Sequence, residues 1–145
     1  MGREAYLTIN YKFSSDRILD IIKILVKSGW SYYHNNGYVE YLPIGDNDDY
    51  DWQSEQISLD EIEKIIINKQ EQKEMIGINL YYHSNKCGIS ILTESEGKFL
   101  FDLDIDRKTL NKGVTDIAWY YNTIIIPLIN SGCILDHIRF EEYIG

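Results

Sequence analysis

The chain has 145 residues, with 23 Asp or Glu against 14 Lys or Arg, so its formal net charge is −9 at pH 7. A chain of this length is expected to form one domain, residues 1–145, whose core needs neither disulfides nor a metal. The negative charge argues against nucleic acid and against anionic membrane surfaces as partners, because both are bound by basic faces. It favours a protein partner with a basic surface.

The sequence also predicts a cytoplasmic protein. No apolar run follows the first four residues, as a secretory signal would require, and the longest apolar run, 124–129, is too short to cross a bilayer. Cys87 and Cys133 lack the spacing of a metal or redox motif, so we expect both to be buried, reduced thiols.

A strand and a helix are expected first. Apolar residues alternate from Glu4 to Phe13, which indicates a strand with one buried face. The following helix is expected to be capped by Ser14 or Ser15, to run to about Lys27 and to be stopped by Gly29.

A hairpin is expected over residues 30–42, because Asn36–Gly37 is a strong two-residue turn signal. Aromatic residues lie on both of its faces. One interpretation is a ligand pocket at Tyr32 and Tyr41, and the other is a core face backed by a tyrosine-rich solvent face. The turn also sets the expected cross-strand pairs, which are His34 with Val39, Tyr33 with Glu40 and Tyr32 with Tyr41.

The densest charged run lies between Gly45 and Trp52. From Gly45 to Gln56 there are five acidic residues and no basic one, which is typical of a solvated loop. A purely solvating loop has no need of aromatic residues, so their presence here indicates a docking element. The candidate contacts in this acidic loop are Asp46, Asp48, Asp49, Tyr50, Asp51 and Trp52.

A second helix and a three-strand meander follow. Ser58 and Glu61 form a capping box, and the helix is expected to run to about Gln70. Runs typical of strands cover 75–82, 87–93 and 98–105, with turn residues between them.

The third of these strands is expected to have one apolar and one acidic face. Phe99, Phe101, Leu103 and Ile105 alternate with Asp102, Asp104 and Asp106. The three carboxylates do not fit an EF-hand loop, and on a strand they would lie about 7 Å apart, too far to hold one ion without other ligands. We therefore take Asp102, Asp104 and Asp106 as further candidate partner contacts.

A third helix and a last strand complete the chain. The helix is expected from Thr115 or Asp116 to about Asn130, with a kink at Pro127 and a stop at Gly132. The strand is expected over 134–143. Its predicted faces carry Ile134, Asp136, Ile138 and Phe140 on one side, and Leu135, His137 and Arg139 on the other.

We find no catalytic signature. The three histidines, at 34, 83 and 137, are scattered, and no H-x-x-x-H, C-x-x-C, G-x-S-x-G or phosphate-binding glycine loop is present. The sequence gives no reason to expect an enzyme, a cofactor or a bound metal.

Several stretches near the C-terminus carry a family resemblance, namely Thr115–Tyr121, Ile126–Ile129, Gly132 and Ile138–Phe140. Together with the overall size, the acidity and the order of elements, they resemble small immunity proteins of bacterial polymorphic toxin systems, including contact-dependent inhibition systems. The resemblance implies an α+β domain that binds a cognate toxin domain tightly in the cytoplasm of the producing cell. Contact residues in such proteins differ between lineages, so none is carried over to this chain.

We therefore expect an α+β fold, with three helices packed on a mostly antiparallel sheet in the order β-α-β-β-α-β-β-β-α-β. An alternative places the first hairpin in a separate sheet. The first functional hypothesis is an immunity protein that occludes a toxin, such as a nuclease, with an acidic surface bearing aromatic residues. The second is a small-molecule-binding or enzymatic domain with a tyrosine-lined pocket, and the third is a subunit of a homo-oligomer. The sequence does not fix the oligomeric state.

Overall fold

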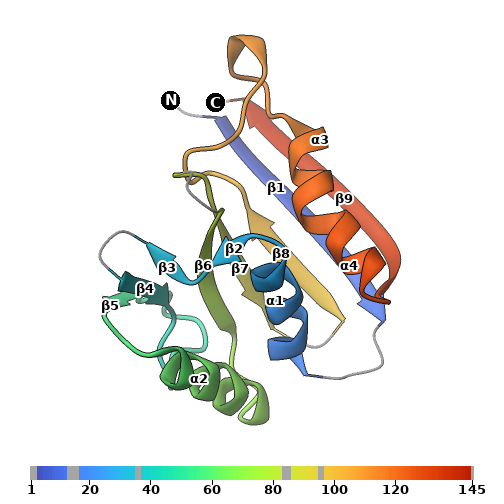
Figure 1. Cartoon of the computed structure of the whole chain (residues 1–145). Coiled ribbons are helices and arrows are strands. Elements are labelled where there is room, and N and C mark those ends of the chain that lie inside the picture. The colour runs from blue at the N-terminus through green and yellow to red at the C-terminus, as the bar shows by residue number, and fades with distance from the viewer. Residues whose placement is uncertain (1–2, 13–16, 35–36, 83–85, 95–96, 145) are drawn as a thin grey trace.

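The computed structural model describes residues 3–12, 17–34, 37–82, 86–94 and 97–144 (Figure 1). Within them, nine strands form one antiparallel sheet in the order β3-β4-β6-β7-β8-β1-β9, with β2 paired to β6 and β5 paired to β4. The strands are β1 (Arg3–Lys12), β2 (Trp30–Ser31), β3 (Tyr33–His34), β4 (Tyr38–Tyr41), β5 (Gln53–Glu55), β6 (Ile76–Tyr82), β7 (Gly88–Thr93), β8 (Lys98–Asp102) and β9 (Ile134–Ile144).

The predicted α+β architecture is confirmed. The meander appears as β6, β7 and β8, which pair in chain order, and β1 lies between β8 and β9. The alternative with a separate first sheet is wrong, because β4 of the hairpin pairs with β6. The acidic loop also leads into a strand that was not predicted, β5, which pairs with β4.

The helices leave one face of the sheet uncovered. They are α1 (Ile18–Lys27), α2 (Leu59–Glu71), α3 (Ile117–Tyr120) and α4 (Ile126–Asn130), with a π-helical turn over Tyr121–Ile125. Figure 1 shows α1, α3 and α4 over the same face, and α2 packs beside α1. No helix of the described chain is long and apolar enough to span a membrane.

Every second side chain of β8 packs into the core beneath these helices. The side chains of Phe99, Phe101 and Leu103 are fully buried, as predicted from their spacing. Cys87 and Cys133 are buried as expected, and they form no disulfide. The odd-numbered positions of β8 therefore face the helices, and the even-numbered ones, Leu100 and Asp102, face the uncovered side.

The predicted hairpin register is wrong by one residue. Tyr33 pairs with Val39 and His34 with Tyr38, whereas Trp30 and Ser31 pair with β6 instead. The packing of Trp30 on β6 explains the shift. Trp30 is 2 % exposed, and its ring meets the Tyr82 ring edge-on with the two ring centroids 5.0 Å apart. Asn36, on which the turn prediction rested, lies outside the described residues, as do both serines expected to cap α1. The described helix begins after Arg17, which forms no side-chain cap, and Gly29 follows its end with φ 118° as expected.

The expected third helix is divided into α3, the π-helical turn and α4. Asp116 caps it as predicted, since its carboxylate accepts the backbone N–H of Trp119 at 3.2 Å. Pro127 has no N–H for the carbonyl of Thr123, four residues earlier, and this carbonyl accepts the indole N–H of Trp30 instead at 2.9 Å. The helical hydrogen bond that Pro127 cannot form thus leaves the Thr123 carbonyl available to the buried indole of Trp30.

The predicted faces of the last strand are wrong at its start. The register shifts between Asn10 and Tyr11, so that Asn10 lies opposite His137 but Tyr11 lies opposite Leu135. This β-bulge turns Leu135 onto the core and leaves Ile134 64 % exposed. Beyond the bulge the prediction holds.

Candidate partner-binding surface

The acidic loop is held to the rest of the molecule by a buried lysine. Lys69, at the C-terminal end of α2, is 1 % exposed, and its ammonium donates to the carbonyls of Pro43 at 2.6 Å and Asp46 at 2.8 Å. It also pairs with Glu74, whose carboxylate accepts the backbone N–H of Gly45 at 2.7 Å. A buried ammonium is stable only when its donors are all paired, so the loop and the lysine require each other.

Asp46 is an internal part of this loop and not a contact residue, which corrects the prediction. It is 5 % exposed, and its carboxylate accepts the backbone N–H groups of Asp49 at 3.0 Å, Tyr50 at 3.1 Å and Asp51 at 2.7 Å. Burial alone would raise the pKa of the Asp46 carboxyl, but these three N–H groups, with Lys69, outweigh it and the pKa is lowered. Asp46 therefore stays ionised and shapes the loop.

The remaining acidic side chains of the loop, Asp48, Asp49 and Asp51, are exposed. Tyr50 is 49 % exposed and sits at φ 54°, a backbone conformation that the hydrogen bonds to Asp46 stabilise. Trp52 is only half-exposed, and its ring would lie 3.0 Å from a Cβ added to Gly77 of β6. Trp52 thus packs on the sheet, whereas Tyr50 is the aromatic residue that the loop displays.

Of the three strand aspartates, the structure brings two together. Asp102 lies opposite Tyr6 of β1 on the uncovered face, and its carboxylate accepts the backbone N–H of Asp104 at 3.0 Å. Asp104 in turn accepts the backbone N–H of Ala5 at 3.1 Å. The predicted row of three does not form, because β8 ends at Asp102 and Asp106 adopts φ 42° beyond the strand.

β1 adds a third acidic residue to this pair, Glu4, which the sequence reasoning missed. The Tyr6 hydroxyl donates to Glu4 at 3.2 Å, so that Glu4, Tyr6, Asp102 and Asp104 form one group, which we call the acidic cluster. Burial raises the pKa of Asp102 to about 6; the Asp104 backbone N–H opposes this, and the carboxylates of Asp104 and Glu4 reinforce it. Burial, followed by the charges of Asp102 and Glu4, also raises the pKa of Tyr6 to about 12. Alternation along β1 placed Glu4 and Tyr6 on the polar face and could have identified them.

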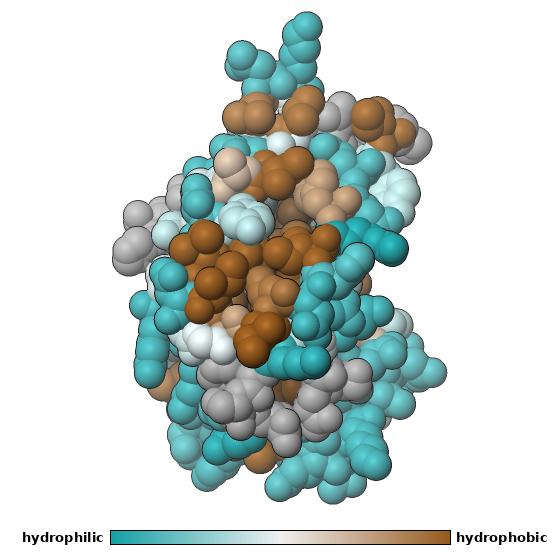
Figure 2. All heavy atoms as spheres, turned by 90° about the vertical axis from the view of Figure 1, so that its right-hand side faces the viewer, coloured by the Kyte–Doolittle hydropathy of each residue, from teal (hydrophilic) through white to brown (hydrophobic). Residues whose placement is uncertain are grey.

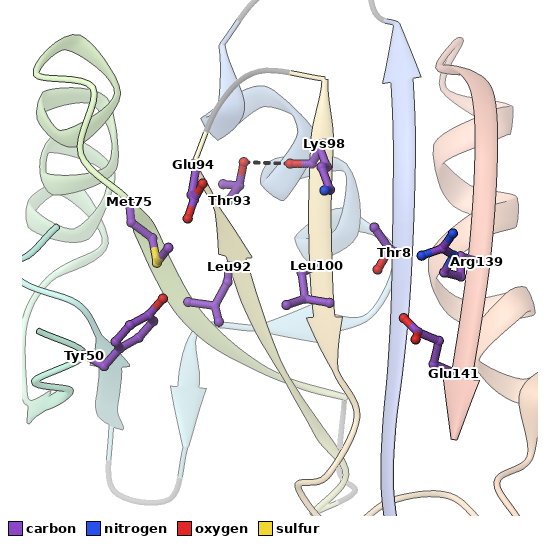
Figure 3. A pocket seen from close by; sticks show the side chains of 10 residues that line it. All are labelled: Thr8, Tyr50, Met75, Leu92, Thr93, Glu94, Lys98, Leu100, Arg139 and Glu141. Atoms are coloured by element: carbon purple, nitrogen blue, oxygen red, sulfur yellow. Dashed lines mark hydrogen bonds between the residues drawn. The ribbon is translucent and has the colours of Figure 1, made fainter. Parts of the chain in front are cut away.

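A groove of about 390 Å³ lies between Tyr50 of the acidic loop and the Arg139 and Glu141 side chains of β9 (Figure 3). Its floor is a cross-strand row made by Leu92, Leu100 and Thr8. Figure 3 shows Tyr50 and Met75 at one end of this row and Arg139 with Glu141 at the other. Asp102 lies two residues after Leu100 on β8 and therefore borders the groove. The sequence did not indicate this groove, because six separate segments contribute its residues.

The two hairpin tyrosines of the predicted pocket are buried. Tyr32 is 2 % exposed and Tyr41 is 6 % exposed, so both belong to the core. The Tyr41 hydroxyl donates to Glu55 of β5 at 2.5 Å. In the described part of the chain, no group of three or more His, Cys, Asp or Glu side chains could hold a metal ion.

Comparison with known proteins gives no relative. No family model, no curated protein and no solved structure matches the chain.

Proposed function

We propose that this protein is an immunity protein that binds a cognate bacterial toxin domain and neutralises it by covering a basic functional surface, such as the phosphate-binding site of a nuclease. It acts in the cytoplasm of the producing cell, and it acts by binding, not by catalysis. The proposal follows the resemblance of the C-terminal stretches, the net charge of −9 and the geometry of the uncovered face.

One observation carries the proposal. Six carboxylates of the acidic loop and the acidic cluster form no ion pair with any described Lys or Arg side chain; they belong to Asp48, Asp49, Asp51, Glu4, Asp102 and Asp104. A surface that keeps unpaired charges on an internally braced loop is suited to a cationic partner, because little has to reorder on binding.

The arrangement assigns different tasks to the charges and to the aromatic residue. The exposed carboxylates speed encounter with a basic surface, since opposite potentials steer diffusing proteins toward each other. Tyr50 supplies a rigid, amphipathic anchor at the edge of the groove, where a partner side chain can be desolvated.

The first test asks whether a partner exists. The product of the adjacent gene in the native host should be retained on this immobilised protein, and its toxicity should disappear when both proteins are co-expressed. An adjacent product that is neither bound nor neutralised would contradict the proposal.

The second test locates the surface. Because Asp46 is structural, it is left intact, and Asp49 and Asp51 are reversed to lysine. We expect association with the toxin domain to slow by about tenfold and to lose much of its salt dependence, because steering depends on these charges. The control variant D60K/D136K makes the same change in net charge at exposed carboxylates of α2 and β9. Equal association rates for the two variants would reject the loop as the binding site.

A further inference from the structure

The sheet ends in a long open edge. β9 has 11 residues and is the last strand in the sheet order, paired on one side with β1. In the described chain nothing pairs with its outer side, although α3 and α4 lie over one of its faces (Figure 1). An exposed strand edge of this length presents a row of backbone N–H and C=O groups that favours pairing with another strand.

Apolar side chains gather on the same side of the molecule. Figure 2 looks onto this side and shows a central apolar patch bordered by hydrophilic residues. The exposed apolar side chains of β9 are Ile134 (64 % exposed), Ile138 (37 %), Tyr143 (54 %) and Ile144 (77 %), and those of the helical segments over it are Ile117 (44 %), Tyr121 (40 %) and Ile129 (44 %). An apolar patch with a polar rim is typical of a protein–protein interface.

The charges along β9 indicate which partner fits. Asp136 lies in the β-bulge, and beyond it one face of the strand carries the cation Arg139 followed by the anion Glu141. A second copy of the same strand, running antiparallel, presents these charges in the reverse order. The edge is therefore complementary to itself, as the interface of a two-fold symmetric dimer must be.

We propose that the protein forms a homodimer by antiparallel pairing of β9 with β9 of a second copy, in a register centred on Phe140. In this register Arg139 of each copy lies directly opposite Glu141 of the other, with Cβ atoms about 5 Å apart. The two-fold axis is perpendicular to the sheet, so the sheet continues through both copies. Thr115 donates to Glu142 at 2.7 Å, which places the start of α3 and its exposed Ile117 near this axis.

The test measures the mass of the purified full chain over a range of concentrations by analytical ultracentrifugation. We expect the mass to rise from 17.0 kDa toward twice that value. R139E and E141R should each raise the dimer dissociation constant by about tenfold or more, because each variant turns two attractive pairs into two repulsive ones. The double variant R139E/E141R restores the pairing and should bring the constant back to the wild-type value.

The control D60K/K64D exchanges the charges of an exposed ion pair on α2 and should leave the dissociation constant unchanged. If a single variant fails to fold, hydrogen exchange of wild-type β9 amides serves instead, and their protection should rise with protein concentration. A wild-type chain that stays monomeric at every concentration would overturn the dimer and leave the edge to a different protein. A double variant that dimerises no better than the single ones would overturn the register.

Discussion

Replacing Lys69 with methionine should unfold the protein at a much lower denaturant concentration. Methionine fills a similar volume but cannot donate to the carbonyls of Pro43 and Asp46, which lie 2.6 and 2.8 Å from the ammonium. Each hydrogen bond from a charged donor contributes about 1.5 to 3 kcal/mol, so losing two costs about 3 to 6 kcal/mol. Two effects reduce this cost. The Glu74 carboxylate still accepts the hydrogen bond from the Gly45 N–H, and the variant no longer has an ammonium to desolvate on folding. The net loss should be about 3 to 5 kcal/mol, as for other buried charges whose partners are broken.

Urea unfolding followed by tryptophan fluorescence measures this loss. With a slope of about 2 kcal/mol per molar urea, the midpoint should fall by about 1.5 to 2.5 M. Lys64 on the same helix offers the matched control, since its side chain is 75 % exposed and pairs with an equally exposed Asp60, and K64M should leave the midpoint unchanged. A K69M midpoint within about 0.5 M of the wild type would show that the loop does not depend on this lysine.

Two further substitutions test the uncovered face. Because burial raises the pKa of Asp102 to about 6 in the folded state, ionising it destabilises the fold as pH rises from about 4 to 6. D102N keeps an acceptor for the Asp104 N–H but removes the charge. It should therefore raise the free energy of unfolding at pH 7 by about 1 to 2 kcal/mol, a value that allows for solvent screening. At pH 4, where Asp102 is protonated in the folded state, the substitution should have little effect. An equal effect at both pH values would contradict the assignment. G77A should destabilise the fold by about 1 to 3 kcal/mol, because the added Cβ would lie 2.6 Å from the Leu42 side chain. Thermal unfolding measures this change, and an unchanged melting temperature would show that Leu42 and Trp52 pack elsewhere.

Local sequence patterns predicted those parts of the fold that local physics determines. The alternation at Phe99, Phe101 and Leu103 correctly gave the buried face of β8. The capping box also forms as expected, with the Glu61 N–H donating to the Ser58 hydroxyl at 3.1 Å. In both cases the residues that decide the structure lie within a few positions of one another.

Long-range contacts decided the features that the sequence did not predict. The hairpin register follows from the packing of Trp30 on Tyr82 and its bond to Thr123, 93 residues away. The burial of Lys69 was missed for the same reason, since its partners lie in a loop more than twenty residues earlier. A turn signal or a helical periodicity contains no information about such partners.

Asp46 and its neighbours show why residue type alone does not identify a binding surface. Four aspartates occupy six consecutive positions, and composition treats them as equivalent. The structure uses the first, Asp46, as an acceptor for the backbone N–H groups of Asp49, Tyr50 and Asp51, so a charge that composition would assign to a partner instead holds the loop in shape. The outward display of Asp49 and Asp51 depends on the inward position of Asp46, and that position depends in turn on Lys69. Reversing all four charges would combine loss of the surface with loss of the loop, and only variants that keep Asp46 can separate binding from folding.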